Sequence, residues 1–310
     1  MSKWTCLLWL VSCFFWTGTA AGEDGSAPRV VVSIKPIHSL VASLMAGVGT
    51  PELLLNGGAS PHGYVLRPSE ARALATADLV IWVGPELESF LHKPLVSLGA
   101  KTRSLTLLEA MQPHLLPLRN NTEDEDHHHH HAVGANDATR TDPHFWLDPV
   151  LAMELVRQVG TVLSELDPTH RAAYEANSRR LINRLETLDR DIRTFLAPVR
   201  DIPYLVFHDA YQYFEKAYQL HLVAAVTLNP ERSPGAKRIS EIRRKIQISG
   251  ARCVFREPQF EPKLLAIITE NTGIRTGVLD PLGANLATGP EAYFQLLQGL
   301  TNALVQGLSP

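Results

Sequence analysis

The chain of 310 residues contains very little cysteine. Cys6 and Cys13 lie within the first 21 residues, which leaves Cys253 as the single cysteine of the remaining chain. A lone cysteine excludes an intramolecular disulfide in that part of the molecule, even in an oxidising compartment.

Basic charge and long apolar runs are scarce as well. The net charge is −3, which provides no basic surface for nucleic acid. The one long apolar run, Trp4 to Trp16, follows a single lysine and precedes small residues at 18–22. This pattern is typical of a secretory signal peptide and is too short for a membrane span. We therefore expect residues 1–21 to be removed and the mature protein to be soluble and exported.

A second interpretation of the N-terminus is a lipoprotein, because "LVSC" at 10–13 resembles a lipidation box that ends at Cys13. The apolar run continues through residues 14–16, beyond the cysteine that would carry the lipid. This continuation favours simple cleavage near Ala20 or Ala21.

Short apolar runs alternate with helical patterns along the rest of the chain, which is typical of a parallel sheet covered by helices. We expect strands in the first half at 29–34, 52–55, 78–84 and 101–108, and in the second half at 204–209, 222–228, 251–257 and 275–280. No repeat of fixed period accompanies them. The sequence therefore predicts an α/β fold with two similar lobes, an N-terminal lobe at 22–167 and a C-terminal lobe at 198–310.

One long helix is expected between the lobes, over 168–197. Its apolar positions are spaced three or four residues apart and so share one face. They are Tyr174, Ser178, Leu181, Leu185, Leu188, Ile192 and Phe195. Because Arg and Glu crowd the other faces, we expect a single bracing helix, roughly 40 Å long, rather than a coiled coil.

A polar segment at 113–141 has no hydrophobic period, and its composition predicts a mobile loop. It contains five consecutive histidines: His127, His128, His129, His130 and His131. Histidines on flexible backbone must be ordered when they bind a metal ion, and this ordering lowers the affinity. We therefore expect weak, auxiliary metal binding in this loop. A neutral solvated linker is the alternative.

Three single histidines stand in a different setting. His62 follows the second expected strand in "SPHGYV", His144 lies in "DPHFWLDP", and His208 closes the strand in "YLVFHD". In open parallel sheets, ligands bind beyond the carboxyl ends of the strands. We therefore expect these side chains to meet in one cleft, where three neutral imidazoles would suit Zn²⁺. The other histidines outside the loop are expected at the surface or in packing: His38, His92, His114, His170 and His221.

Eight segments, in the same order, resemble those of the high-affinity zinc-uptake solute-binding proteins of ABC transporters. They are "SIKPIHSL", "SPHGYVLRPSEARAL", "ADLVIWVGPELESFL", "DPHFWLDPV", "VFHDAYQYFEKAYQL", "ERSPGAKRISEIRRKI", "CVFREPQF" and "LDPLG". An acidic, histidine-rich loop ahead of the second ligand is also typical of the zinc members. The resemblance covers nearly the whole mature chain.

The resemblance implies two Rossmann-like lobes with parallel sheets, joined by one long rigid helix, with a metal site in the interlobe cleft. It implies His62, His144 and His208 as ligands of one Zn²⁺ ion. It also implies a periplasmic protein, not an enzyme, that captures zinc and delivers it to a membrane ABC permease with its ATPase subunit. We expect it to act as a monomer.

Two departures from the family pattern matter. Gram-negative relatives often pair the cysteine of the "CVF" segment with one near the C-terminus, but this chain has none there, so Cys253 is expected to be a free, buried thiol. Many zinc relatives place a Glu directly before the first histidine ligand, where this chain has Pro61. The fourth ligand is then a water molecule or Asp280, which ends an expected strand and corresponds to a ligand in manganese-type relatives.

Other functions fit the sequence less well. Three histidines with an open position also occur in zinc hydrolases, but no H-E-x-x-H or similar pairing supplies a general base. A manganese or iron carrier of the same family would favour more carboxylate oxygens than three imidazoles provide. A surface adhesin, a role of some lipidated relatives, would need the lipid anchor that the N-terminus disfavours.

Overall fold

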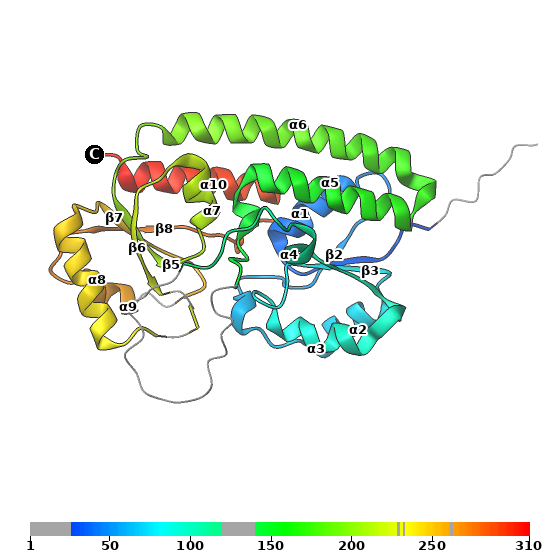
Figure 1. The fold of residues 1–310 in the computed structure, drawn as a ribbon, viewed down its shortest axis with the longest axis horizontal. Coiled ribbons are helices and arrows are strands. Elements are labelled where there is room, and N and C mark those ends of the chain that lie inside the picture. Colours follow the sequence, from blue (N-terminus) through cyan, green and yellow to red (C-terminus); the bar gives the residue numbers. More distant parts are fainter. Residues whose placement is uncertain (1–25, 120–139, 228–229, 232, 261–262) are drawn as a thin grey trace, which may run out of the picture.

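The computed structural model describes residues 26–119, 140–227, 230–231, 233–260 and 263–310 (Figure 1). Residues 1–21, for which a signal peptide with Cys13 is expected, lie outside the described residues, as does the run His127–His131. No helix within the described ranges is long and apolar enough to cross a bilayer.

Each half of the chain forms one parallel sheet of four strands. The first sheet contains β1 (Val30–Val32), β2 (Glu52–Leu53), β3 (Leu79–Trp82) and β4 (Arg103–Thr106), in the order β2-β1-β3-β4. The second contains β5 (Tyr204–His208), β6 (Leu222–Thr227), β7 (Cys253–Arg256) and β8 (Arg275–Val278), in the order β6-β5-β7-β8. All eight predicted strands are therefore confirmed. In both sheets the first strand lies inside the sheet, and the chain turns to one side of it and then to the other, which creates a switch point at its carboxyl end.

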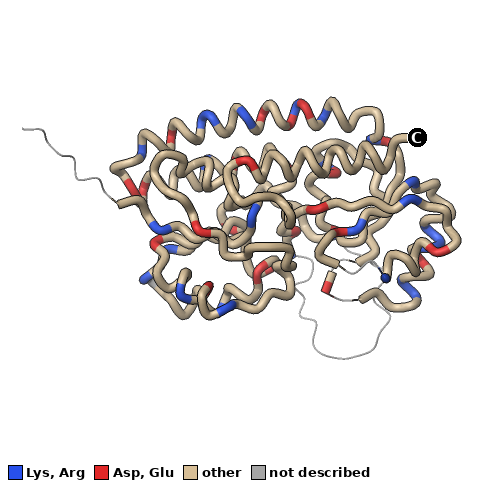
Figure 2. The backbone as a smooth tube through the Cα atoms, turned by 180° about the vertical axis from the view of Figure 1, so that it is seen from behind, with Lys and Arg blue, Asp and Glu red and all other residues tan. Residues whose placement is uncertain are grey.

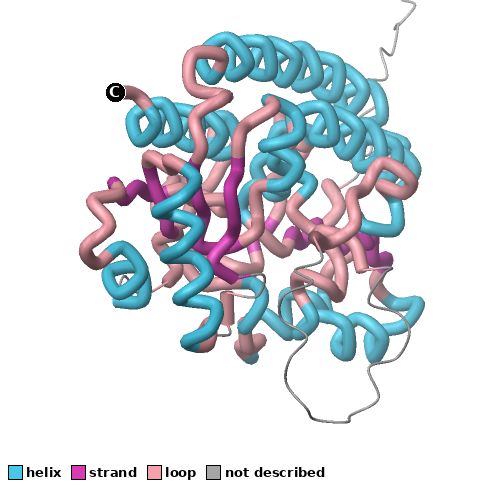
Figure 3. Tube along the Cα trace, turned by 60° about the vertical axis from the view of Figure 1, so that its left-hand side comes forward, coloured by secondary structure: helices cyan, strands magenta, loops and turns pink. Residues whose placement is uncertain are grey.

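Helices cover both faces of each sheet (Figures 1 and 3). The first half contributes α1 (Lys35–Leu44), α2 (Pro68–Thr76), α3 (Ser89–Leu98), α4 (Leu107–Ala110) and α5 (Pro149–Leu166). The second half contributes α7 (Gln212–Tyr218), α8 (Ala236–Ser249), α9 (Lys263–Thr269) and α10 (Ala292–Leu308). Helix α6 (Arg171–Leu196) runs along the top of both lobes in Figure 1.

The inner strands β1, β3 and β5 are apolar on both faces because both faces are buried, whereas the edge strands β4 and β8 are partly exposed and contain polar residues. Val30 and Val32 of β1 pack into one core, while Val31 between them packs into a second core with α2 and α3. The second sheet divides in the same way, since Leu205 and Phe207 face a separate core under α8 and α9. The alternation follows from the two-residue period of a strand.

The largest core is continuous from one lobe to the other. It joins β1 and β3 of the first sheet to β5 and β7 of the second, through side chains of α1, α5, α6 and α10. The lobes are therefore joined by packed apolar surface and not by a hinge of bare chain.

Helix α6 confirms the predicted linking helix, with one error in its apolar face. Tyr174, Leu181, Leu185, Leu188 and Ile192 are buried as expected. The prediction for the last position of this face is wrong. Phe195 is 64% exposed, and the neighbouring Leu196 is buried in its place. A helix turns by 100° per residue, so at this end the buried face has moved by one position. Acidic and basic residues are interspersed along α6 in Figure 2.

Cys253 of β7 is a free and fully buried thiol, as predicted. Burial raises the pKa of the Cys253 thiol to about 12, although Arg275 opposes the shift. A thiol with so high a pKa is not a reactive nucleophile at neutral pH.

Candidate metal centre

The three histidines His62, His144 and His208 lie at the interface between the lobes. His208 is the last residue of β5, at the switch point of the second sheet. His62 lies in a short 3₁₀ turn, Pro61–Gly63, where the Ser60 hydroxyl accepts a hydrogen bond from its backbone N–H at 3.3 Å. His144 directly precedes the 3₁₀ turn Phe145–Leu147. Two histidines therefore come from the first lobe and one from the second.

The geometry of the three side chains suits one metal ion. Each ring offers one nitrogen, and these nitrogens all lie within 4.8 Å of one another. The ring centroids are 5.6 Å apart for His62 and His144, 5.1 Å for His62 and His208, and 5.0 Å for His144 and His208. Tetrahedral zinc with bonds of about 2.0–2.1 Å holds its ligand atoms roughly 3.3 Å apart. No pair has to approach by more than about 1.5 Å to reach that geometry.

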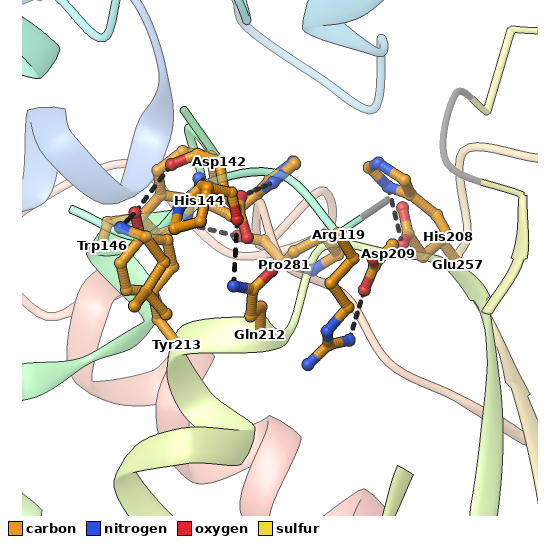
Figure 4. Close-up of polar contacts among 12 residues, drawn as sticks. Arg119, Asp142, His144, Trp146, His208, Asp209, Gln212, Tyr213, Glu257 and Pro281 are labelled. Carbon is orange, nitrogen blue, oxygen red and sulfur yellow. Dashed lines mark hydrogen bonds and ion pairs between the residues drawn. The ribbon is translucent and has the colours of Figure 1, made fainter. Parts of the chain in front are cut away.

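Asp142 fixes the ring of His144. Its Oδ1 atom accepts a hydrogen bond from the His144 backbone N–H at 3.0 Å and lies 2.8 Å from Nδ1 of the ring (Figure 4). A carboxylate accepts and does not donate, so Nδ1 carries the proton and Nε2 keeps its lone pair. Burial raises the pKa of Asp142 to about 7, against the effect of the His144 N–H. Such an outer carboxylate is the usual partner of a metal-binding histidine.

Glu257 plays the same part for His208. Its Oε1 atom lies 3.2 Å from Nδ1 of His208 (Figure 4). The same Oε1 atom accepts a hydrogen bond from the Tyr211 hydroxyl at 3.2 Å. The Nε2 atom of His208 is then directed elsewhere, and it is buried without a hydrogen-bond partner. The Nε2 atom of His62 is also buried and unpartnered. Buried polar atoms of native proteins are nearly always paired, so these two atoms indicate a missing ligand.

The histidines differ in how readily they take up a proton. Burial first, and then the charges of His208 and His144, together lower the pKa of His62 to about 2. Burial, followed by His208, holds the pKa of His144 well below its ordinary value. For His208, burial is the largest effect and acts to lower the pKa, but the carboxylates of Glu257, Asp209 and Asp142 together outweigh it and the pKa is raised. His62 and His144 are therefore neutral at neutral pH, and His208 donates to a cation once its extra proton has left.

The space between the rings is small. The cavity is lined by Ser60, Pro61, His62, Leu87, His144, Trp146, His208, Glu257, Gln259, Phe260, Pro281 and Leu282. Its volume is ≈ 10 Å³, which is room for about one water-sized group. Trp146 closes one side, with its Nε1–H donated to the Pro281 carbonyl of the other lobe at 2.9 Å. The site therefore fits a bare ion and excludes an organic ligand.

The comparisons with known proteins agree with this site. A family model described as zinc-uptake complex component A, periplasmic, matches residues 30–307. The chain is 41% identical to the high-affinity zinc uptake system protein ZnuA of Brucella suis, over 97% of this chain and 98% of that protein. It is 39% identical to the ZnuA of Yersinia pestis, over 91% and 92% of the two chains.

The chain belongs to this zinc-uptake family.

Solved structures support the same assignment. A crystal structure of ZnuA, 25% identical, matches with a TM-score of 0.76 over 91% of this chain and 100% of that one. The solute-binding protein FpvC of Pseudomonas aeruginosa, in complex with Mn²⁺, is 19% identical and matches with a TM-score of 0.77. The second match shows the fold alone. The fold alone therefore does not determine which metal ion is bound. The metal has to be inferred from the donor atoms of the site.

The structure does not bring Asp280 into the group of three histidines. Its Oδ1 atom accepts hydrogen bonds from the backbone N–H groups of Leu282 and Gly283, at 3.1 and 2.9 Å, and Oδ2 accepts one from Ala284 at 2.6 Å. Gln259 donates to Oδ1 as well, at 3.1 Å. Because this carboxylate is occupied by the turn that follows β8, we do not include Asp280 among the ligands.

Three residues of the site were absent from the sequence prediction: Asp142, Glu257 and Gln259. Asp142 stands two residues before His144, and this short spacing is a signal that could have found it. Glu257 and Gln259 follow β7, the strand that pairs with β5. Their nearness to His208 depends on strand order, which the sequence does not show.

The remaining histidines play the parts expected of them. None of the others that the structure describes joins the group formed by His62, His144 and His208. His38 is buried with its Nε2 atom 3.0 Å from the Pro51 carbonyl, and Nδ1 of His170 lies 2.7 Å from the Asp167 carboxylate.

Proposed function

We propose that this protein binds one Zn²⁺ ion through His62, His144 and His208 and delivers it to a membrane ABC permease with its ATPase subunit. One observation carries the proposal. The Nε2 atoms of His62 and His208 are buried at one cavity without hydrogen-bond partners. His144 lines the same cavity, and because Asp142 binds its Nδ1–H, its Nε2 atom keeps a lone pair for a ligand. A cation is the ligand that satisfies three imidazole nitrogens at once.

The donor set favours zinc over manganese or iron. Neutral imidazole is a borderline donor that suits Zn²⁺, while Mn²⁺ prefers hard oxygen ligands. The two carboxylates nearest the histidines, Asp142 and Glu257, are each engaged at Nδ1 of a ring and support the ligands from outside. The names of the zinc-uptake relatives point to the same metal.

The same two carboxylates weigh against a zinc hydrolase. Hydrolysis needs a general base within hydrogen-bond reach of a metal-bound water. Glu257 is the one carboxylate among the residues that line the cavity, and its oxygen is shared by His208 and Tyr211. Membership of a transport family agrees with a carrier and not with catalysis.

In this zinc-transport role, the signal peptide, the histidine run and the two lobes would each have a separate function. A signal peptide at 1–21 would export the protein to the periplasm, where a monomer would load zinc. The run His127–His131 would act as a weak, auxiliary collector that raises the local metal concentration near the cleft. The loaded molecule would then present both lobes to the permease. These steps extend the family assignment and rest on the three-histidine site.

The test is a zinc titration against a competing chelator, with mature protein purified without a tag. The wild type should bind one ion tightly, and His144→Ala should weaken binding by at least about 100-fold, because the loss of a ligand exceeds the 10–100-fold loss seen for an outer partner. His92→Ala is the matched control, since His92 lies exposed on α3, and it should bind like the wild type. Equal affinity in the His144 variant would disprove the site.

A further inference from the structure

Gln259 lies in the wall of the metal cavity, three residues after β7 ends at Arg256. Its side-chain amide has one donor end, Nε2, and one acceptor end, Oε1. The two ends have different neighbours. Nε2 lies 3.1 Å from Oδ1 of Asp280, while Oε1 is buried and has no hydrogen-bond partner.

The orientation of this amide is determined by chemistry. A carboxylate offers acceptors only, so the end of the Gln259 amide that faces Asp280 has to be the NH₂ group. Asp280 cannot turn to accommodate the other end, because three backbone N–H groups of residues 282–284 hold its oxygens. Lys35 fixes the same turn from the other lobe, through hydrogen bonds to the carbonyls of Gly283, Ala284 and Leu286 at 2.7, 3.0 and 2.8 Å.

Three buried atoms without partners therefore belong to residues that line one cavity: Nε2 of His62, Nε2 of His208 and Oε1 of Gln259. Each of these atoms can offer a lone pair, and no hydrogen-bond donor contacts it. Unpaired buried groups are rare in native proteins, and three lining the same space indicate one shared electron-pair acceptor. Zinc accepts oxygen ligands beside imidazole nitrogens, as in its carboxylate-containing sites, and an amide carbonyl supplies the same donor atom without the charge.

The geometry points to Gln259 Oε1 as the fourth ligand of the zinc ion, with Asp280 as the positioning residue that aims it. This inference rests on the proposed function. It also gives Asp280 an indirect part at the site in place of direct ligation. A neutral amide oxygen leaves the charge of the ion unchanged and binds more weakly than a carboxylate, which suits a carrier that must release its metal.

The first test compares zinc affinities. Gln259→Leu has nearly the same shape without the oxygen, and it should weaken zinc binding by about 10–100-fold, which is less than the loss in His144→Ala. Gln212→Leu is the matched control, because Gln212 also has a buried, unpartnered Oε1 but does not line the cavity. It should bind zinc like the wild type. If Gln259→Leu fails to fold, Gln259→Asn keeps the amide and shortens its reach, and the same loss is expected.

A double-mutant cycle tests the positioning role of Asp280. Asp280→Asn allows the Gln259 amide to flip, so it should weaken binding about as much as Gln259→Leu. The double variant should lose no more than either single variant, because both changes remove the same contact. A merely structural role for Asp280 would instead make the two losses add.

A zinc-bound crystal structure is the decisive measurement. The inference requires Oε1 of Gln259 within about 2.5 Å of the ion. A longer distance, or a Gln259→Leu variant that binds like the wild type, overturns it. The two proposals fail differently. If the wild type binds no zinc tightly, the proposed function fails, whereas an effect of His144→Ala without an effect of Gln259→Leu refutes the fourth ligand alone.

Discussion

At the scale of single residues, the site consists of histidines whose rings are held by carboxylates. Asp142 and Glu257 each engage the Nδ1 side of a ring, which leaves the Nε2 side toward the cavity. An imidazole with its tautomer fixed in advance does not have to reorganise when the ion arrives. The sequence predicted that the three histidines meet because they follow apolar runs of a parallel α/β fold, and the structure brings them together. It missed Glu257 because the nearness of Glu257 to His208 depends on strand order, and it missed Asp142 although Asp142 stands only two residues before His144.

Asp142→Asn should weaken zinc binding by about 10–100-fold without preventing it. The amide has the same shape, but it neither carries the charge that raises the basicity of His144 nor fixes its tautomer as strictly. The measurement is the chelator competition used for the histidine variants. Asp148→Asn is the control, because Asp148 caps α5 through the Val150 N–H and Asn caps a helix equally well. Equal affinities for both variants and the wild type would show that the carboxylate is dispensable.

Zinc affinity should fall as the pH falls, with a slope set by no more than two protons. Among the three histidines only His208 has a raised pKa in the metal-free protein, while the pKa of His62 lies near 2 and that of His144 well below 6.5. The second group is Asp142, whose pKa is raised to about 7 and whose ionised form holds the His144 ring. Below these pKa values zinc must displace the protons of both groups, so the affinity falls by about 10–100-fold per pH unit.

Titrations between pH 5.5 and 7.5 check this slope. Three ordinary histidines, each with a pKa near 6.5, would compete with up to three protons and give a slope approaching three at low pH. A slope between one and two supports the environments described for His62 and His144. A flat profile through this range contradicts the role of His208.

At the scale of elements, the central strands were the most predictable, because each of them is short, apolar and buried on both faces. Val30–Val32 and Leu79–Trp82 need no long-range information to be assigned. The end of α6 was less predictable, since a spacing of three and a spacing of four are both compatible with a helix. The neighbouring core decides between them, and it buries residue 196 and leaves Phe195 in solvent.

The stem of the histidine-rich loop is held by the second lobe. Leu118 and Arg140 form a backbone hydrogen bond of 2.9 Å across the stem, next to the bridge between Pro117 and Thr141. Arg119 then forms ion pairs with Asp209, at 2.6 Å, and with Glu215. The segment that carries Asp142 and His144 is therefore anchored by residues outside the histidine run.

Deletion of residues 123–131 should remove weak zinc sites and leave the tight one intact. The deleted segment contains neither the stem contacts nor any of the three cavity histidines. Calorimetry of the wild type and the deletion variant checks this through the number of weak sites and the affinity of the strong one. Loss of the strong site together with the loop would place it in the histidine run instead.

At the scale of the whole molecule, the two lobes share one continuous core. Side chains of α1, α5, α6 and α10 connect the inner faces of both sheets. Polar contacts cross the same boundary near the site, where the Tyr293 hydroxyl donates to the Trp146 carbonyl at 2.7 Å and Tyr213 donates to the Asp142 carbonyl at 2.9 Å. A shared core makes independent unfolding of one lobe costly, because it would expose the apolar surface of the other.

The metal-free protein should therefore unfold in one thermal transition, and zinc should raise its midpoint. A ligand that binds only the native state at 100 times its Kd adds about 2.7 kcal/mol, which corresponds to a rise of roughly 5 °C for a chain of this size. Differential scanning calorimetry with and without zinc measures both. His144→Ala keeps the shared core and should retain the single transition while losing most of the zinc-dependent rise. Two separate transitions in the metal-free wild type would mean that the lobes unfold independently and that the core does not couple them.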